Sequence, residues 1–352
     1  MSGPSQLSVG RAVDWQFAGT VGAKLARPAP PATDYTRRQA IDELATAACA
    51  AERPVREVTR LGNDQAVPDA RIIDRQQWIR AASASMRVMT GGTDRPSNPI
   101  TGRITGAQTG AVLAFVSSGI LGQFDPFAVE GQGGQLLLVY PNVIAVERQL
   151  RVSPSDFRLW VCLHEVTHRV QFSANPWLAQ HMSRALGVLT SDAGDDFAAV
   201  AARLADFVKK RRRQGRGNPD PNEVGILGFM RAVQSEPQRA AMDQLLVLGT
   251  LLEGHADHVM DAVGPAVVPS VHVIRQRFDQ RRQRHQPPLQ RLLRALLGLD
   301  AKLSQYTRGK AFVDHVVTKV GMDRFNTVWS GPDTLPLPDE IEAPQRWIDR
   351  VL

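Results

Sequence analysis

The sequence contains little cysteine and no long apolar segment. Only two of its 352 residues are cysteines, Cys49 and Cys162, and their number and spacing exclude a disulfide framework and a cysteine-based metal site. No apolar run approaches the ~18 residues that a membrane helix needs, and residues 1–30 lack the basic start and apolar core of a secretion signal. We therefore expect a cytoplasmic protein without a membrane span.

Lysine is also scarce, although the chain is basic. Only six of the 42 basic residues are lysines, and the net charge is +7. The densest basic run, residues 209–217, could bind phosphates. No aromatic residues interleave with it to stack on bases, and a basic run that ends in glycine is typical of a solvated helix end. The sequence therefore disfavours nucleic-acid binding, and it gives no indication of the oligomeric state.

The clearest functional signal is the stretch 163–169, LHEVTHR. Its two histidines, His164 and His168, are four residues apart and share one face of a helix, so both imidazoles can bind one metal ion. Glu165 is placed to act as a base on a water at that metal. This H-E-x-x-H pattern is typical of zinc peptidases. The alternative is a buried helix whose histidines hydrogen-bond to carbonyl groups.

The surrounding residues predict that this motif lies in the middle of a helix. Ser153 can cap the helix, Pro154 suits its first turn, and Asp156 stands where a carboxylate completes a capping arrangement. The dipeptide at 175–176, Asn-Pro, ends the helix. Between these points one apolar stripe predicts a face that packs into the core. The stripe consists of Leu159, Leu163, Val166 and Val170.

A catalytic zinc site usually has a third protein ligand. Gln171 and Ala174 stand where the H-E-x-x-H-x-x-G-x-x-H class needs glycine and histidine, so that class is excluded. The other common solution takes a glutamate from a later helix, and Glu253 follows an apolar segment that predicts a buried helix. A carboxylate on such a helix is costly unless it meets a cation. Asp257, four residues on, can accept the distal N–H of a liganding histidine.

Two histidines close to Glu253 are rival ligands. His255 and His258 point away from the Glu253 face by roughly 160 and 140 degrees, at 100 degrees per helical residue. We therefore prefer Glu253 as the third ligand, with His255 as the alternative.

The motifs at 164–168 and 252–257, followed by the segments 263–265 and 268–271, resemble the zincin-like metallopeptidase type 2 family. Its members are largely uncharacterised hydrolases, some labelled as associated with deazaflavin coenzyme biosynthesis. The resemblance extends from Asp14 to the last helix. It implies a zincin fold that binds one Zn2+ per chain through His164, His168 and Glu253, with Glu165 as the catalytic base.

The remaining patterns predict a mainly α fold of the α+β class with a small β element. We expect an N-terminal helical region over residues 1–95 and a zincin-like catalytic region over 96–352, together forming one compact unit. Residues 135–140 predict a strand, either edging the cleft or lying in the core. Small residues at 102, 106, 110 and 114 predict a closely packed helix. Further helices are expected at 9–27, 35–61, 74–89, 176–189, 195–213, 271–284, 289–299, 300–320 and 344–352.

The functional hypothesis is zinc-dependent hydrolysis of a peptide or small amide substrate, with Glu165 moving the proton. Candidates for stabilising the developing oxyanion are Tyr306, His272 and His315, and nothing in the spacing selects among them. One alternative is a catalytically silent zincin scaffold that binds metal or partners. Another is a basic helical interaction protein in which the histidines are merely buried.

Overall fold

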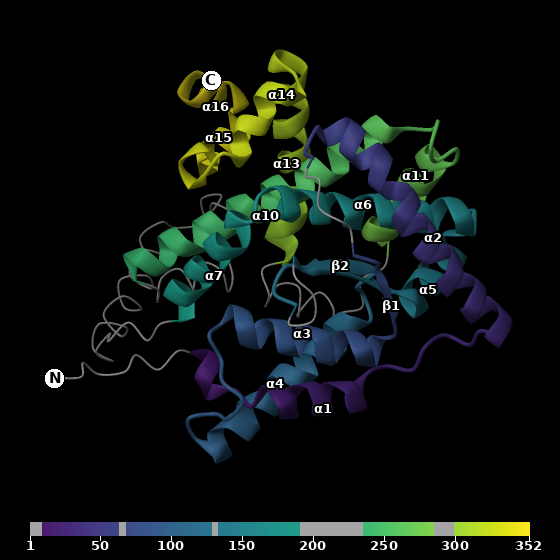
Figure 1. Cartoon of the computed structure of the whole chain (residues 1–352), viewed down its shortest axis with the longest axis vertical. Helices are drawn as coiled ribbons and strands as arrows, with labels where there is room; N and C mark the ends of the chain where they lie inside the picture. Colours follow the sequence, from purple (N-terminus) through teal and green to yellow (C-terminus); the bar gives the residue numbers. More distant parts are fainter. Residues whose placement is uncertain (1–8, 63–67, 129–132, 191–234, 285–298) are drawn as a thin grey trace, which may run out of the picture.

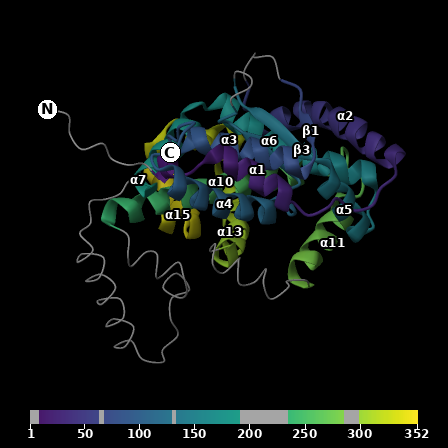
Figure 2. The ribbon, with the colours of Figure 1, turned by 90° about the horizontal axis from the view of Figure 1, so that it is seen from below.

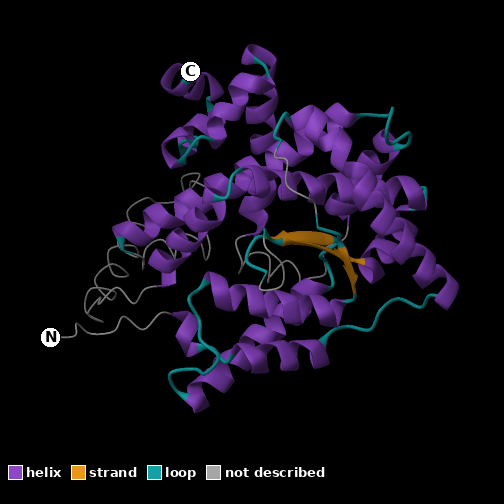
Figure 3. Ribbon diagram, in the orientation of Figure 1, coloured by secondary structure: helices purple, strands orange, loops and turns teal. Residues whose placement is uncertain are grey.

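Figure 1 shows the computed structural model of the chain, which describes residues 9–62, 68–128, 133–190, 235–284 and 299–352. Helices surround one small sheet, as the orange arrows among purple ribbons show in Figure 3. The predicted mainly helical fold with a small β element is confirmed. No helix within these ranges has the length and apolar character needed to cross a membrane.

The sheet has three strands in the order β1-β3-β2. β3 (Gln135–Val139) is central, pairing parallel to β1 (Arg71–Ile73) and antiparallel to β2 (Gly122–Asp125). The predicted strand at 135–140 is therefore confirmed as a core strand. The two edge positions belong to β1 and β2, and the sequence patterns revealed neither strand.

One layer of helices lies below the sheet in Figure 1 and faces the viewer in Figure 2. The predicted small-residue helix is α4 (Pro99–Ser117), and it packs closely on α1 (Trp15–Leu25). A Cβ at Gly106 would lie only 2.6 Å from the Asp14 carbonyl oxygen. At Gly110 it would lie 2.5 Å from the Ala18 carbonyl oxygen. The layer consists of α1 (Trp15–Leu25), α3 (Arg75–Met89) and α4 (Pro99–Ser117), with η1 (Val9–Ala12) before α1.

The second layer carries the H-E-x-x-H motif on α6 (Pro154–Ala174), which packs against the opposite face of the sheet and against α2. The stripe residues Leu163, Val166 and Val170 are fully buried in the main core, as predicted. This layer consists of α2 (Asp34–Thr59), α5 (Tyr140–Leu150), α6 and α11 (Val271–Arg284).

A third group of helices lies around α10 (Glu236–Val263), the predicted buried helix that carries Glu253. α10 packs on α6, α7 and α13, and therefore connects the motif helix to the C-terminal part of the chain. The group comprises α7 (Trp177–Thr190), α10, α13 (Leu299–Val320), α14 (Met322–Phe325), η3 (Asn326–Trp329), η4 (Pro332–Thr334), α15 (Pro338–Glu342) and α16 (Pro344–Val351).

Most expected helices form close to their predicted ends, although Asp14 divides the helix expected at 9–27 by capping α1. The helices expected at 195–213 and 289–299 and the basic run at 209–217 lie outside the described residues. Helices from residues 1–95 lie in both layers, because α2 packs on α6 while α1 and α3 pack on α4. The division at residue 95 stays a prediction.

Candidate metal centre

The N-terminus of the motif helix is fixed by a contact between helices. No side-chain hydrogen bond from Ser153 caps α6, and Asp156 does not complete a capping arrangement as predicted. Instead, an Asp156 carboxylate oxygen accepts a hydrogen bond from the backbone N–H of Ser270 at 2.9 Å. The carboxylate therefore ties the start of α6 to the start of α11, and it supplies an acceptor for a backbone N–H at the α11 end.

Buried ion pairs hold α6 on both sides of the motif. The Arg158 guanidinium donates to both carboxylate oxygens of Glu147, at 3.0 and 2.8 Å, and also to Glu43 on α2. Arg169, directly after the second histidine, donates to Glu52 on α2. Because buried arginines need such partners, these ion pairs favour one rotational setting of α6 against α2 and α5. That setting turns the histidines toward α10.

The structure brings His164, His168 and Glu253 together, with one potential ligand atom from each residue within 4.8 Å of the others. The two Nε2 atoms are 3.2 Å apart. Glu253 Oε2 lies 3.3 Å from His164 Nε2, and Oε1 lies 3.7 Å from His168 Nε2. A tetrahedral zinc site with bonds of about 2.05 Å has edges of about 3.3 Å, so this donor set fits zinc in both chemistry and spacing.

Glu165 lies beside this group with its side chain almost fully enclosed, since the residue is 8% exposed. A Cβ on Gly122 of β2 would lie 2.6 Å from Glu165 Cγ, so only glycine leaves room for the carboxylate. Burial raises the pKa of Glu165 to about 7, against the lowering effect of the His164 charge. Its carboxyl group can therefore both accept and release a proton near neutral pH.

The two histidines have different protonation preferences when no metal is bound. Burial lowers the pKa of His164, but the hydrogen bond and negative charge of Glu253 outweigh it and raise the pKa to about 9. Burial also lowers the pKa of His168, and here the lowering prevails. The metal-free site therefore holds a proton between His164 and Glu253, and a metal must displace it.

Each distal ring nitrogen has a partner that the sequence analysis did not identify. His168 Nδ1 lies 2.9 Å from Gln171 Oε1, and His164 Nδ1 lies 3.3 Å from Met260 Sδ. The sequence prediction gave this role to Asp257. In the structure Asp257 instead lies beside Arg275, whose Nη1 is 3.6 Å from a carboxylate oxygen, and it acts on both liganding histidines only through its charge.

The rival ligands are engaged elsewhere. His255 is fully buried against the rings of Phe325 and Trp329, and burial lowers its pKa to about 3, so it stays neutral. His258 Nδ1 is paired with Asp314 Oδ1 at 2.7 Å. Among the described residues, neither joins the group of potential metal ligands, so the helical-face argument that favoured Glu253 agrees with the geometry.

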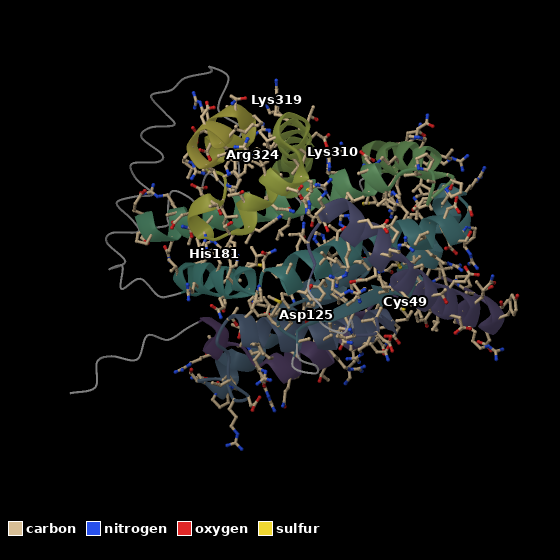
Figure 4. All side chains as sticks on the ribbon, turned by 45° about the horizontal axis from the view of Figure 1, so that its top comes forward. Cys49, Asp125, His181, Lys310, Lys319 and Arg324 are labelled. Atoms are coloured by element: carbon tan, nitrogen blue, oxygen red, sulfur yellow. The ribbon has the colours of Figure 1, made fainter. Side chains whose placement is uncertain are left out.

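An ionic network supports the C-terminal half of α10. Arg275 of α11 contacts Asp257 and Asp261, and Lys310 of α13 contacts Asp261 and Asp314. Lys310 is labelled on α13 in Figure 4. The network joins α10 to two neighbouring helices, and so fixes the helix that presents Glu253.

The proposed oxyanion-stabilising residues are not brought to this site by any contact in the described structure. His272 is exposed on α11. His315 is partly buried on α13, and its Nε2 has no hydrogen-bond partner among the described groups. Tyr306 belongs to α13, but its side chain lies outside the described residues.

Sequence reasoning missed Gln171, Met260 and Gly122. Gln171 could have been found, because it follows His168 by three residues and so extends the histidine face of α6. Met260 and Gly122 carry no local signal. Their roles depend on contacts between α10 or β2 and α6.

A family model described as zincin-like metallopeptidase matches residues 13–348. The chain belongs to the zincin-like metallopeptidase family. The chain is also similar to a crystal structure from Chloroflexus aurantiacus, described as a "putative hydrolase with a novel fold". The two are 30% identical with a TM-score of 0.66, over 96% of this chain and 98% of that chain. No curated protein matches the chain.

Membership of the zincin-like metallopeptidase family accounts for the residues gathered here. The family implies zinc, and the chain offers two imidazoles and one carboxylate at tetrahedral spacing. The resemblance noted from the sequence motifs is thus confirmed over nearly the whole chain.

Proposed function

We propose that this protein is a zinc-dependent hydrolase that cleaves peptide or amide bonds, with His164, His168 and Glu253 as zinc ligands and Glu165 as the base. The observation that carries the proposal is the convergence of the three ligand atoms from α6 and α10 beside a buried glutamate. A site with a purely structural metal has no need of such a base.

When bound, zinc supplies a Lewis acid that polarises a carbonyl group and makes a water molecule more acidic. The chain's own part is proton transfer and exclusion of bulk water. Glu165 accepts the proton of the attacking water and delivers it to the leaving nitrogen. In the metal-free protein burial raises the pKa of Glu165 to about 7, so its carboxyl group can exchange a proton near neutrality.

The sheet edge supports a peptide as the substrate. β2 pairs with β3 on one side, and no strand among the described residues pairs with its other side. Its first residue, Gly122, touches Glu165, so β2 leads directly to the proposed base. An extended peptide that adds to this edge through backbone hydrogen bonds would bring a peptide bond to the metal.

The first test is the zinc content of protein purified without added metal. We expect one zinc per chain in the wild type and a clear loss in Glu253→Ala. Glu236→Ala is the matched control, because it removes an exposed carboxylate from the other end of α10 and should keep the zinc. A wild-type protein that takes up no zinc, even after reconstitution, would refute the metal site.

The second test is cleavage of a broad peptide library by the zinc-loaded protein. Glu165→Gln should retain zinc and lose turnover by about 100-fold to 10,000-fold, since it removes a general base. If the variant kept its turnover, Glu165 would not be the base. If the zinc-loaded wild type cleaved neither peptides nor small amides, the site would be that of a silent scaffold.

A further inference from the structure

One buried amide connects both helices that carry the metal ligands. Gln171 of α6 is fully buried, and among the described residues its side-chain amide lies within hydrogen-bond distance of three groups. Its Oε1 lies 2.9 Å from His168 Nδ1, while its Nε2 lies 3.0 Å from the Leu252 carbonyl oxygen and 2.9 Å from His255 Nδ1. Leu252 directly precedes Glu253 on α10. The side chain of Gln171 therefore touches one ligand and the backbone beside another.

The chemistry of these groups determines where the protons lie. A carbonyl oxygen only accepts, so the Gln171 amide nitrogen must face Leu252 and donate to it. The second N–H of the same NH2 group then needs an acceptor, and His255 Nδ1 must carry a lone pair. The Gln171 oxygen is left facing His168, so His168 Nδ1 carries the hydrogen. His168 Nε2 thus presents its lone pair toward His164 and Glu253.

His255 fixes this arrangement because its ring cannot turn easily. Its centroid lies 5.4 Å from that of Phe325, with the planes stacked, and 5.4 Å from that of Trp329. Its Nε2 is buried without a hydrogen-bond partner among the described groups, so Gln171 provides the one polar contact recorded for the ring.

We propose that Gln171 and His255 form a positioning relay that keeps His168 in the Nδ1–H tautomer and holds its Nε2 toward the metal. The relay also links the orientation of the His168 ring to the backbone of α10 next to Glu253. It thereby holds the ligands on α6 and the ligand on α10 in a fixed position relative to each other. Neither residue touches the metal or the substrate. The inference rests on the proposed zinc site, but the tautomer itself is a property of the metal-free protein.

The tautomer is measured by long-range proton–nitrogen NMR of full-length, metal-free protein labelled with 15N at its histidines. His168 signals are assigned through their loss in His168→Gln. We expect the Nδ1–H form in the wild type. In Gln171→Leu, which removes the acceptor with little change of volume, the proton should move toward Nε2, where the Glu253 carboxylate lies. An unchanged tautomer in this variant would overturn the relay.

The second measurement is zinc affinity, by competition with a chelator. Loss of a partner that orients a ligand typically weakens metal binding by about 10- to 100-fold, and we expect this range for Gln171→Leu. His255→Phe keeps an aromatic ring but removes the acceptor, and should weaken binding about tenfold. His255→Asn places an oxygen where Nδ1 stood and should restore affinity to within about threefold of wild type.

Thr250→Val is the matched control, because it removes a buried hydroxyl that bonds only to its own helix, at the Leu246 carbonyl oxygen, and should leave zinc affinity unchanged. Thermal melting identifies any variant that fails to fold. The zinc affinities of His255→Phe and His255→Asn then decide whether the relay exists. Equal affinities for His255→Phe and His255→Asn would refute the relay while leaving the zinc site intact. A wild type without zinc affinity would refute the proposed function, while the NMR result would still decide the relay.

Discussion

Zinc binding should depend steeply on pH because the metal must displace a proton from His164. In the metal-free protein the hydrogen bond and charge of Glu253, whose Oε2 lies 3.3 Å from His164 Nε2, raise the pKa of His164 to about 9. Zinc binds only the deprotonated ring. Below pH 9 the apparent zinc affinity therefore falls toward tenfold per pH unit, and the ratio between the affinities at pH 9 and pH 7 is about 50-fold, or roughly 2 kcal/mol.

The assay is competition at fixed pH values with a chelator whose own zinc affinity is known at each pH. Calorimetry in buffers of different ionisation enthalpy counts the protons released, and about one proton per zinc is expected from His164 at pH 7. Glu253→Gln provides the comparison. It removes the charge that raises the pKa of His164, so burial should bring that pKa to or below its ordinary value. The variant should bind more weakly, with most of the pH dependence between 7 and 9 gone.

Two results would refute this reasoning. One is a wild-type zinc affinity that is equal at pH 7 and pH 9. The other is the same pH dependence in Glu253→Gln as in the wild type, which would show that Glu253 does not control the proton.

Four further outcomes follow from the same geometry. The metal-free protein should lose stability as pH rises. The raised pKa of His164 contributes up to about 3 kcal/mol to the free energy of unfolding below pH 6.5, and this contribution is lost as the pH rises through 9. Denaturant titrations at pH 6.5 and 9.5 measure the difference. Gly122→Ala should keep zinc but lower peptidase turnover at least about tenfold, because its Cβ would lie 2.6 Å from Glu165 Cγ. Turnover equal to that of the wild type would contradict the close approach of β2 to Glu165. Gly254→Ala should destabilise the fold by about 1–3 kcal/mol and weaken zinc binding, because its Cβ would lie 2.2 Å from the α13 backbone. On the same helix, Gly249→Ala meets nothing within 4 Å and should stabilise the protein by about 0.5–1 kcal/mol in the same melting experiment.

Local signals were sufficient to predict the longer helices. The apolar stripe of α6 and its Ser153-Pro154 start predicted a helix that the structure shows over Pro154–Ala174. Helical periodicity is a property of neighbouring residues, so it can be read before any packing is known.

The sheet could be predicted only in part, because its strands are short. β3 has a run of buried apolar residues and was found from the sequence. β1 and β2 contain three and four residues, too few to show an alternating pattern. Their strand conformation depends on pairing with β3, which is a contact between distant segments.

By itself, the sequence determined the two histidines and Glu165 as a candidate site, since residues four apart on a helix must share a face. It also narrowed the third ligand to Glu253 or His255. The tertiary structure favours Glu253, because it packs the buried His255 against two aromatic rings and brings Glu253 to the histidines. It alone placed Met260 and Gly122 beside the site, because packing of α6 against α10 and β2 sets these contacts and no local pattern encodes them.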